Sequence, residues 1–307
     1  MLRLGQVKRA IARARAVANR PANKPAPTVT KFWTDFNVTE HHNFRTAEES
    51  LDYFDWRSGH YFDYLSHMPV AGHDGKVILD YVCGPGHDLV GFGHFSKPAR
   101  LVGADISESS LAESRFRLGL HRIPCELVRL DENKVQLPFP DATFDHIASS
   151  GVLHHVSDLT SVLRELRRVL KPSGELRIMI YNYDSLFLHL HTAYIVRVKE
   201  SRMKELSLRD AFRELTDAPG CPISHCYRPQ EFVDIVEREG FRGNHVGNAL
   251  SAYELQILPL RGEALQKREL PREHRDFLRE LRLDDRGLPK HGDHLAGIDG
   301  CYRFSPA

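Results

Sequence analysis

The sequence predicts an α/β fold in which a mostly parallel β-sheet is covered by helices on both faces. From residue 77 onward, short apolar runs alternate with amphipathic stretches at helical spacing. A glycine-rich turn, CGPG, directly follows the first run, and the second run reaches a carboxylate, Asp105. This alternation is typical of parallel sheets, because each parallel strand pair needs a crossover connection.

The alternation can be followed element by element up to residue 182. Five apolar runs predict strands, at residues 77–82, 101–106, 125–130, 143–150 and 175–182. Three amphipathic stretches predict helices, at residues 87–95, 107–122 and 157–174. The third helix is the best marked, because Ser157 or Asp158 caps it and Pro172 ends it.

Beyond residue 182 the pattern is looser. Residues 228–241 and 271–283 predict further helices, and residues 297–305 predict a closing strand at the edge of the sheet. Residues 185–227 are inserted between the fifth strand and the next helix, and we expect them to lie on the substrate side. Residues 31–75 are dense in aromatic side chains, and we expect a helical lid segment there, although most of its rings serve core packing.

The first 30 residues differ from the rest of the chain. Residues 1–24 carry seven basic side chains and no acidic one, and their apolar residues fall at helical spacing. One interpretation is a targeting helix, or a helix that makes peripheral membrane contact; the other is a solvated or self-docked arm. Because PANKPAPTVT reads as an extended linker, we expect a basic N-terminal arm and linker over 1–30 and one domain over 31–307.

Composition excludes several classes of protein. The chain has 307 residues, is 41% hydrophobic and has a formal net charge of +1, so bulk charge does not indicate a nucleic-acid partner. No apolar run is long enough to span a bilayer. The five cysteines are an odd number without regular spacing, which favours a reducing compartment and shows no zinc-type pairing. We therefore expect a cytoplasmic protein without a metal site.

The glycine-rich turn predicts a ligand site, because ligands of such sheets bind beyond the carboxyl ends of the strands. Gly84 and Gly86 let a ligand approach the backbone closely. The carboxylate of Asp80, just before the turn, would repel a pyrophosphate and suits an ammonium or sulfonium group. Asp105, about twenty residues further on, stands where a carboxylate takes two ribose hydroxyls, and Ile106 can pack on an adenine face.

With these motifs the sequence resembles the class I S-adenosylmethionine-dependent methyltransferases of the small-molecule type. The likeness is carried by ILDYVCGPG, VGADIS, LPFPDATFDHI, GVLHHVSD and LRELRRVLKPSGELRI, in the family's order. It implies a Rossmann-like, seven-stranded, mostly parallel sheet with an N-terminal helical extension and substrate-side insertions. The sequence departs from the family at Val82, where glycine is usual, and a branched side chain there narrows the pocket on the methionine side.

The resemblance implies a cofactor, S-adenosyl-L-methionine, and a set of residues that bind it. Asp80 would lie near its ammonium group, Gly84 and Gly86 would form the floor, and Asp105 would hold the ribose. Asp131 is the best match for the acidic residue that meets the adenine amino group, with Asn133 as the alternative. Ser150 would lie beside the methionine moiety.

Two adjacent histidines, His154 and His155, follow the fourth predicted strand. Imidazole titrates near neutrality, so either ring suits a general base that takes the proton of a hydroxyl acceptor. A packing or hydrogen-bonding role is the alternative for both. His155 matches the family position, while His154 is the additional one and is a candidate for the position nearer the acceptor.

The function expected from the sequence is O-methylation of a small-molecule hydroxyl group, on a sugar or a natural-product alcohol. An N- or C-methyltransferase acting on a small molecule is one alternative, and a non-catalytic cofactor-binding protein is another. A nucleic-acid partner is disfavoured, because the body of the chain has no stripe of basic and aromatic residues.

Overall fold

The computed structural model describes residues 28–37, 43–217 and 220–307. The predicted basic arm lies outside the described residues up to residue 27. Helix α2 (Val29–Asp35) begins within the predicted linker, because the hydroxyl of Thr28 accepts a hydrogen bond from the backbone N–H of Lys31. Among the described helices, none combines the length and apolar character that crossing a membrane requires.

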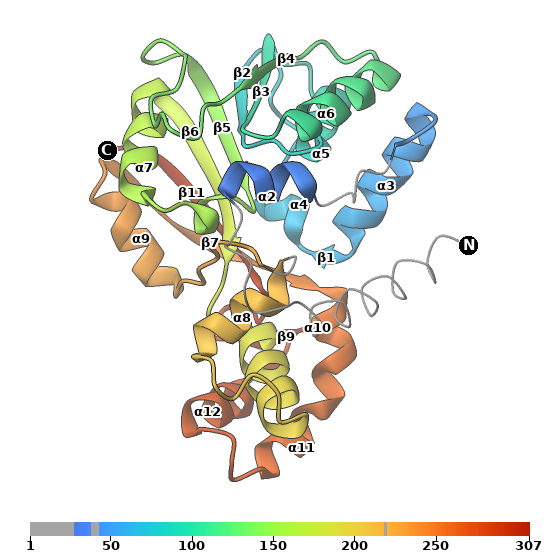
Figure 1. Cartoon of the computed structure of the whole chain (residues 1–307), viewed down its shortest axis with the longest axis vertical. Coiled ribbons are helices and arrows are strands. Elements are labelled where there is room, and N and C mark those ends of the chain that lie inside the picture. Colours follow the sequence, from blue (N-terminus) through green and yellow to red (C-terminus); the bar gives the residue numbers. More distant parts are fainter. Residues whose placement is uncertain (1–27, 38–42, 218–219) are drawn as a thin grey trace.

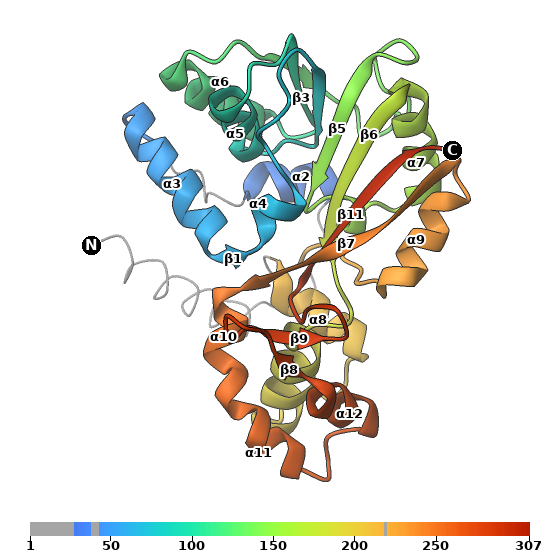
Figure 2. The same cartoon turned by 180° about the vertical axis from the view of Figure 1, so that it is seen from behind.

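In the described part of the chain, eight strands form the main sheet, in the order β1-β7-β11-β6-β5-β2-β3-β4 (Figures 1 and 2). Neighbouring strands from β6 to β4 run parallel, and β11, β7 and β1 are antiparallel to their neighbours. The strands are β1 (Tyr61–Phe62), β2 (Val77–Tyr81), β3 (Arg100–Asp105), β4 (Glu126–Arg129), β5 (Phe144–Ser150), β6 (Leu170–Tyr181), β7 (Phe241–Ser251) and β11 (Asp299–Pro306). The predicted mostly parallel α/β sheet is confirmed, and the eighth strand is the two-residue β1 at one edge.

Helices cover both faces of this sheet, as predicted, and each face has its own core. Residues that alternate along β2 separate the two cores: Ile78 packs with Phe54 and Leu89, and Leu79 lies in the opposite core. Figures 1 and 2 show α3, α5 and α6 on one side and α7 and α9 on the other. These helices are α3 (Ala47–Gly59), α5 (His87–Phe95), α6 (Glu108–His121), α7 (Leu159–Val169) and α9 (Pro229–Glu237); the short α4 (Tyr64–His67) precedes β2.

The closing strand lies in a different place from the one expected. The sequence predicts an edge strand at residues 297–305, but β11 lies between β6 and β7 and pairs with both. The partner on its outer side, β7, carries polar residues and glycines along its first half, so its pattern did not predict a strand. Because β11 is hydrogen-bonded to a strand on each side, it has no free edge. The edge of the sheet is formed by β7 and the short β1 instead.

A second, mostly helical unit lies below the sheet in the view of Figure 1 and has its own apolar core, with Leu190, Tyr194, Leu278 and Leu295 among its buried residues. It is built from the predicted insertion and from the segment between β7 and β11. Its elements are η2 (Phe187–Lys199, π-helical), α8 (Leu208–Thr216), α10 (Ala252–Ile257), η3 (Leu258–Leu260), α11 (Arg261–Gln266), α12 (Arg272–Glu280), β8 (Arg282–Leu283), β9 (Pro289–His291) and β10 (His294–Leu295). This helical lobe faces the end of the sheet where the predicted site residues lie.

Candidate active site

The carboxyl ends of β2, β3 and β5 surround a cavity of about 460 Å³, here called the glycine-turn cavity. Its wall contains six of the seven predicted cofactor residues, namely Asp80, Gly84, Asp105, Ile106, Asp131 and Ser150. The seventh, Gly86, begins α5 with φ 75°, and a Cβ atom there would lie 2.8 Å from Ser114 Oγ. Gly86 therefore lets α5 approach α6 closely and lies outside the cavity wall.

Asp105 fastens the glycine turn to the end of β3. Its carboxylate accepts the backbone N–H of Gly84 at 2.7 Å and that of Ser107 at 2.7 Å. The side chain is buried, and this burial raises the pKa of Asp105 to about 6. Because an ionised carboxylate offers about four acceptor positions, acceptor capacity remains for hydroxyl donors in the cavity.

The turn itself contains a strained residue. Gly84 has φ 53°, a left-handed conformation that glycine adopts freely. Val82, two residues earlier, has φ 58°, which is rare for a β-branched residue. Its side chain lines the glycine-turn cavity and packs against the core. Val82, which stands where the family usually has glycine, thus keeps the left-handed backbone conformation that suits glycine.

The methionine side of this cavity holds two charged groups, the predicted Asp80 and Arg57, which sequence reasoning did not find. Asp80 Oδ2 is buried without a hydrogen-bond partner, and burial, followed by the charge of Asp88, raises the pKa of Asp80 well above its ordinary value. The guanidinium of Arg57 in α3 lies close enough to oppose this rise. The guanidinium of Arg57 has no hydrogen bond or ion pair within the described residues. A single arginine inside helix α3 forms no sequence motif, which explains why it was missed.

A second cavity, of about 620 Å³, adjoins the first and is here called the aromatic cavity. Aromatic side chains from the segment 31–75 and from β6 and α10 dominate its wall: Trp33, Phe36, Tyr53, Trp56, Tyr61, Tyr64, Tyr181 and Tyr253. Of the described residues, six line both cavities: Trp33, Arg57, His87, Ser150, Gly151 and His155. The two cavities therefore meet at the carboxyl end of β5.

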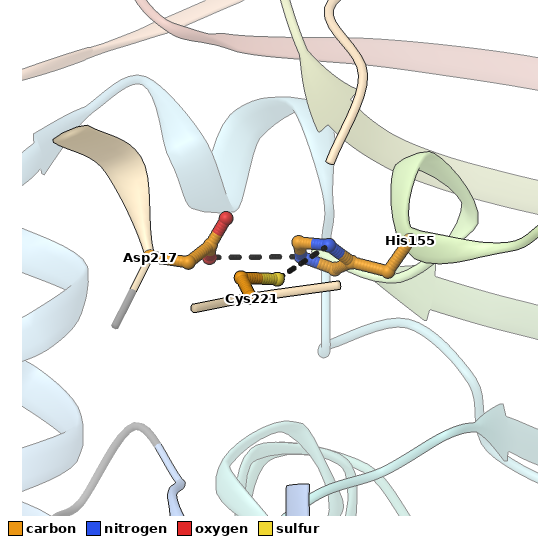
Figure 3. Close-up of side chains that lie close together, drawn as sticks. All are labelled: His155, Asp217 and Cys221. Atoms are coloured by element: carbon orange, nitrogen blue, oxygen red, sulfur yellow. Dashed lines mark hydrogen bonds and ion pairs between the residues drawn. The ribbon is translucent and has the colours of Figure 1, made fainter. Parts of the chain in front are cut away.

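His155 lies at this junction and contacts three residues of the segment that follows α8, of which Figure 3 shows Asp217 and Cys221. Its Nδ1 is 2.6 Å from the carbonyl oxygen of Ile223, and its Nε2 is 3.6 Å from Oδ1 of Asp217. Because a carbonyl oxygen only accepts, Nδ1 carries a proton and the lone pair of neutral His155 is on Nε2. Cys221 Sγ lies 3.8 Å from Nδ1. One ligand atom each of His155, Asp217 and Cys221 lies within 4.8 Å of the others, so this trio could also hold a metal ion.

Asp217 is held in place by the fifth predicted strand. The hydroxyl of Tyr181, at the end of β6, donates to Asp217 Oδ1 at 3.0 Å. Burial, with the charge of Asp217, raises the pKa of Tyr181 well above its ordinary value, so this hydroxyl stays protonated as a donor. The predicted insertion, which contains α8, thus supplies a carboxylate to the junction.

The neighbouring His154 lies elsewhere. Its ring is fully buried, stacks near Tyr181 and lines neither cavity. Both ring nitrogens lack hydrogen-bond partners, and burial lowers the pKa of His154 well below its ordinary value. Of the two predicted bases, the structure brings only His155 to the junction of the cavities.

Asp131 and its alternative Asn133 lie together at the far end of the glycine-turn cavity. The backbone N–H and the side-chain amide of Asn133 donate to Asp131 Oδ1 at 3.0 and 3.2 Å. These bonds lower the pKa of Asp131 and favour its ionised form, and its second carboxylate oxygen lies 3.6 Å from Nζ of Lys134. Either side chain can therefore meet an amino group at this end.

The fold and the site define a class of enzyme, and comparisons with known proteins agree. Residues 79–178 match the family model described as a methyltransferase domain. The chain therefore contains a class I S-adenosylmethionine-dependent methyltransferase domain, and S-adenosyl-L-methionine is its cofactor.

Individual relatives place the chain among methyltransferases of different acceptor atoms. Over 140 residues it is 31% identical to the ubiquinone/menaquinone biosynthesis C-methyltransferase UbiE of Shewanella sp. (strain ANA-3), covering 45% of this chain and 55% of that protein. Over 175 residues it is 30% identical to the malonyl-[acyl-carrier protein] O-methyltransferase of Legionella pneumophila, covering 57% of this chain and 55% of that protein. The chain thus spans about half the length of these curated relatives.

A solved structure matches nearly the whole chain. The geranyl diphosphate C-methyltransferase of Streptomyces coelicolor superposes with a TM-score of 0.52 at 12% identity, covering 94% of this chain and 100% of that chain. At this identity the likeness shows the fold alone.

Proposed function

We propose that the protein is a methyltransferase that transfers a methyl group from S-adenosylmethionine to a hydroxyl group of a small molecule. The observation that carries the proposal is the junction of the two cavities, where His155 presents Nε2 beside Asp217. An acceptor in the aromatic cavity reaches this junction from one side, and the cofactor reaches it from the other.

The glycine-turn cavity offers a complementary group for each end of the cofactor. Asp105 keeps acceptor positions for the two ribose hydroxyls, and Ile106 and Leu130 line the same cavity as apolar partners for the adenine. Asp80, with its unpartnered Oδ2, suits the ammonium group. Two cations other than histidine line the cavity among the described residues: Lys134, which pairs with Asp131, and Arg57, which makes no ion pair. We therefore assign Arg57 to the methionine carboxylate.

The cofactor supplies a methyl group already activated on a sulfonium, so the protein has to align the acceptor and receive its proton. As the oxygen–carbon bond forms and the carbon–sulfur bond breaks, the hydroxyl proton passes to Nε2 of His155. The bond from Nδ1 to Ile223 keeps the lone pair of Nε2 directed to the junction. The carboxylate of Asp217 then stabilises the imidazolium, and Tyr181 holds that carboxylate in position.

C-methylation is the second candidate, favoured by the relative described as a C-methyltransferase. Product analysis separates the two. The protein is incubated with S-adenosylmethionine carrying a ¹³C-labelled methyl group and a panel of phenols and alcohols, and the products are analysed by NMR. A methoxy carbon signal supports the proposal, and a methyl carbon attached directly to an acceptor carbon contradicts it.

A metal ion held by His155, Asp217 and Cys221 would give the junction a different chemistry. Chelation distinguishes the two cases, because a proton-accepting histidine is insensitive to it. We expect turnover to be unchanged after dialysis against EDTA. A loss of turnover that zinc restores would replace the base mechanism by metal-assisted ionisation of the hydroxyl.

A further inference from the structure

A carboxyl group that the mechanism does not use lies in the wall of the aromatic cavity. Asp299 is the first residue of β11, and its backbone pairs with Tyr181 on one side and Ala249 on the other. Its side chain lies on the same face of β11 as that of Cys301, because strand residues two apart share a face. Cys301 packs with Tyr64 and Met179, which also line the aromatic cavity. Asp299 therefore faces the space where the acceptor would bind.

This carboxyl group is buried but has no partner in the protein. Asp299 is 4% exposed, and no described residue forms a hydrogen bond or ion pair with its side chain. Burying a polar group without a hydrogen bond is unfavourable, because the group loses its bonds to water and gains none in return. Such a group is stabilised when a ligand supplies the missing bond.

A nearby carboxyl group shows the contrast. Glu254 is also fully buried, but it accepts hydrogen bonds from the backbone N–H groups of Phe187, Ser251 and Ile298. Both carboxylate oxygens of Glu254 therefore accept hydrogen bonds from the protein itself. Asp299 is nearly as buried and has none of these bonds, so hydrogen bonding within the described residues does not explain its placement in the wall.

The state of the Asp299 carboxyl group indicates what kind of partner it takes. Burial, followed by the charge of Glu254, raises the pKa of Asp299 to about 8. A carboxyl group that is neutral at pH 7 does not attract a cation strongly, but it can both donate and accept a hydrogen bond. A hydroxyl group has the same two capacities and is its natural complement.

We propose that Asp299 is a specificity-determining residue that holds a second hydroxyl group of an aromatic acceptor, distinct from the hydroxyl that is methylated. The inference rests on the proposed function for the identity of the cavity. The rings that line the cavity suit a planar aromatic body, and a volume of about 620 Å³ accommodates two or three fused rings. The acceptor class is therefore a polycyclic or bicyclic aromatic diol.

The test compares matched ligands by calorimetry, with S-adenosylhomocysteine present so that no turnover occurs. The probes are 2-naphthol and the 1,3-, 1,5-, 1,6- and 2,7-dihydroxynaphthalenes, which share one ring system and differ in the second hydroxyl. We expect at least one diol to bind the wild-type protein at least tenfold more tightly than 2-naphthol. In Asp299→Val, which fills the space without a polar atom, that ratio should fall to about one.

Two further variants make the result specific. Asp299→Asn keeps a donor and an acceptor and should retain most of the preference for the diol. Asp276→Asn removes a carboxylate from the surface of α12, where it pairs with Arg272 and Arg279, and should leave the ratio unchanged. Thermal unfolding should show Asp299→Asn to be as stable as wild type or more so, because it removes an unpartnered acid.

An equal ratio in wild type and Asp299→Val, or no diol that binds wild type more tightly than 2-naphthol, would overturn the proposal. Failure of the proposed function has a different signature. Diols would then bind with the Asp299-dependent preference, but no methylated oxygen would appear when S-adenosylmethionine replaces S-adenosylhomocysteine.

Discussion

His155 Nε2 lies 3.6 Å from Asp217 Oδ1, across the point where the two cavities meet. The two residues come from opposite sides of the site: His155 follows β5, and Asp217 follows α8 of the inserted segment. Both groups are hydrogen-bond acceptors when His155 is neutral, so a shared proton donor is favoured between or beside them. In the proposed mechanism, the hydroxyl group of the acceptor supplies that proton.

Replacing His155 tests its role as a base. We expect His155→Gln to lower turnover by about a hundredfold or more, because a positioned base typically contributes that much, while the Kd for S-adenosylhomocysteine stays within twofold. Asp217→Asn should lower turnover by about tenfold, because it weakens stabilisation of the imidazolium without removing the base. The measurement is turnover with a phenol from the panel that the wild-type protein methylates, and the control is His121→Gln, at the end of α6 and in the wall of neither cavity. Undiminished turnover in His155→Gln would leave this ring with a structural role.

Cofactor affinity should depend on pH through Asp105. Its folded pKa of about 6 is raised above the ordinary 3.8, so folding favours the neutral acid, and stability falls as the pH rises from about 4 to 6. The cofactor ribose favours the ionised form of Asp105 instead. Only the carboxylate can accept hydrogen bonds from two hydroxyls while it also accepts those of the N–H groups of Gly84 and Ser107. We expect the affinity for S-adenosylhomocysteine to fall by up to tenfold per pH unit below about 6. Calorimetry between pH 5 and 8 measures this.

The isosteric variant Asp105→Asn is the companion to that titration. It loses the charge and one acceptor atom, so its affinity at pH 7.5 should be at least tenfold lower than that of wild type. Its affinity should also be flat between pH 5 and 7. A variant with wild-type affinity would show that Asp105 serves only to fasten the turn.

At position 82 we expect the glycine variant to be more stable than the alanine variant, which is the reverse of the usual order. Glycine normally destabilises a folded protein relative to alanine, but a non-glycine residue in the left-handed region costs about 1–2 kcal/mol. Both Val82→Ala and Val82→Gly lose side-chain packing, and only glycine also relieves the backbone at φ 58°. Val82→Gly should therefore unfold at a higher urea concentration than Val82→Ala. The reverse order would show that the surrounding turn, rather than residue 82, bears the strain.

Glu254 should prove structural. It caps α10 through Ser251 and ties β11 and η2 to this helix through the N–H groups of Ile298 and Phe187. Glu254→Ala leaves three buried donors without partners, a loss of about 3 kcal/mol or more in the free energy of unfolding. Glu254→Gln keeps the oxygen position that accepts most of these bonds and should cost much less. Chemical denaturation of both variants measures the difference, and equal losses would argue against this network.

Much of the sheet could be predicted because its signals are local. The apolar runs, the glycine turn and the caps of α7 lie within short stretches, and Asp158 does accept the backbone N–H of Ser161 as its spacing predicts. The position of β11 could not be predicted in the same way. Strand order depends on pairing between distant segments, and residues 297–305 show only that a strand forms.

The residues of the site can be divided in the same way, into those with a local sequence signal and those without one. Asp80 and Asp105 lie near the carboxyl ends of β2 and β3, and Gly84 lies in the turn after β2, so the sequence predicts that they share one edge of the sheet. Arg57, Asp217 and Asp299 reach that edge from α3, an inserted segment and β11, and no spacing rule connects them. His154 and His155 are adjacent and alike, and only the three-dimensional packing distinguishes the buried ring from the one at the junction.

The central place of β11 has a consequence for how the molecule is made. Translation delivers β6 and β7 well before residues 299–306, yet β7 cannot join the sheet beside β6 until those residues leave the ribosome, because β11 lies between the two strands. During that interval β6 and β7 each have an edge without a hydrogen-bonding partner. Unpaired strand edges of this kind promote aggregation of incompletely folded chains. The same late strand brings Asp299 to the aromatic cavity, so the wall of that cavity is complete only after the last strand of the described sheet has been synthesised.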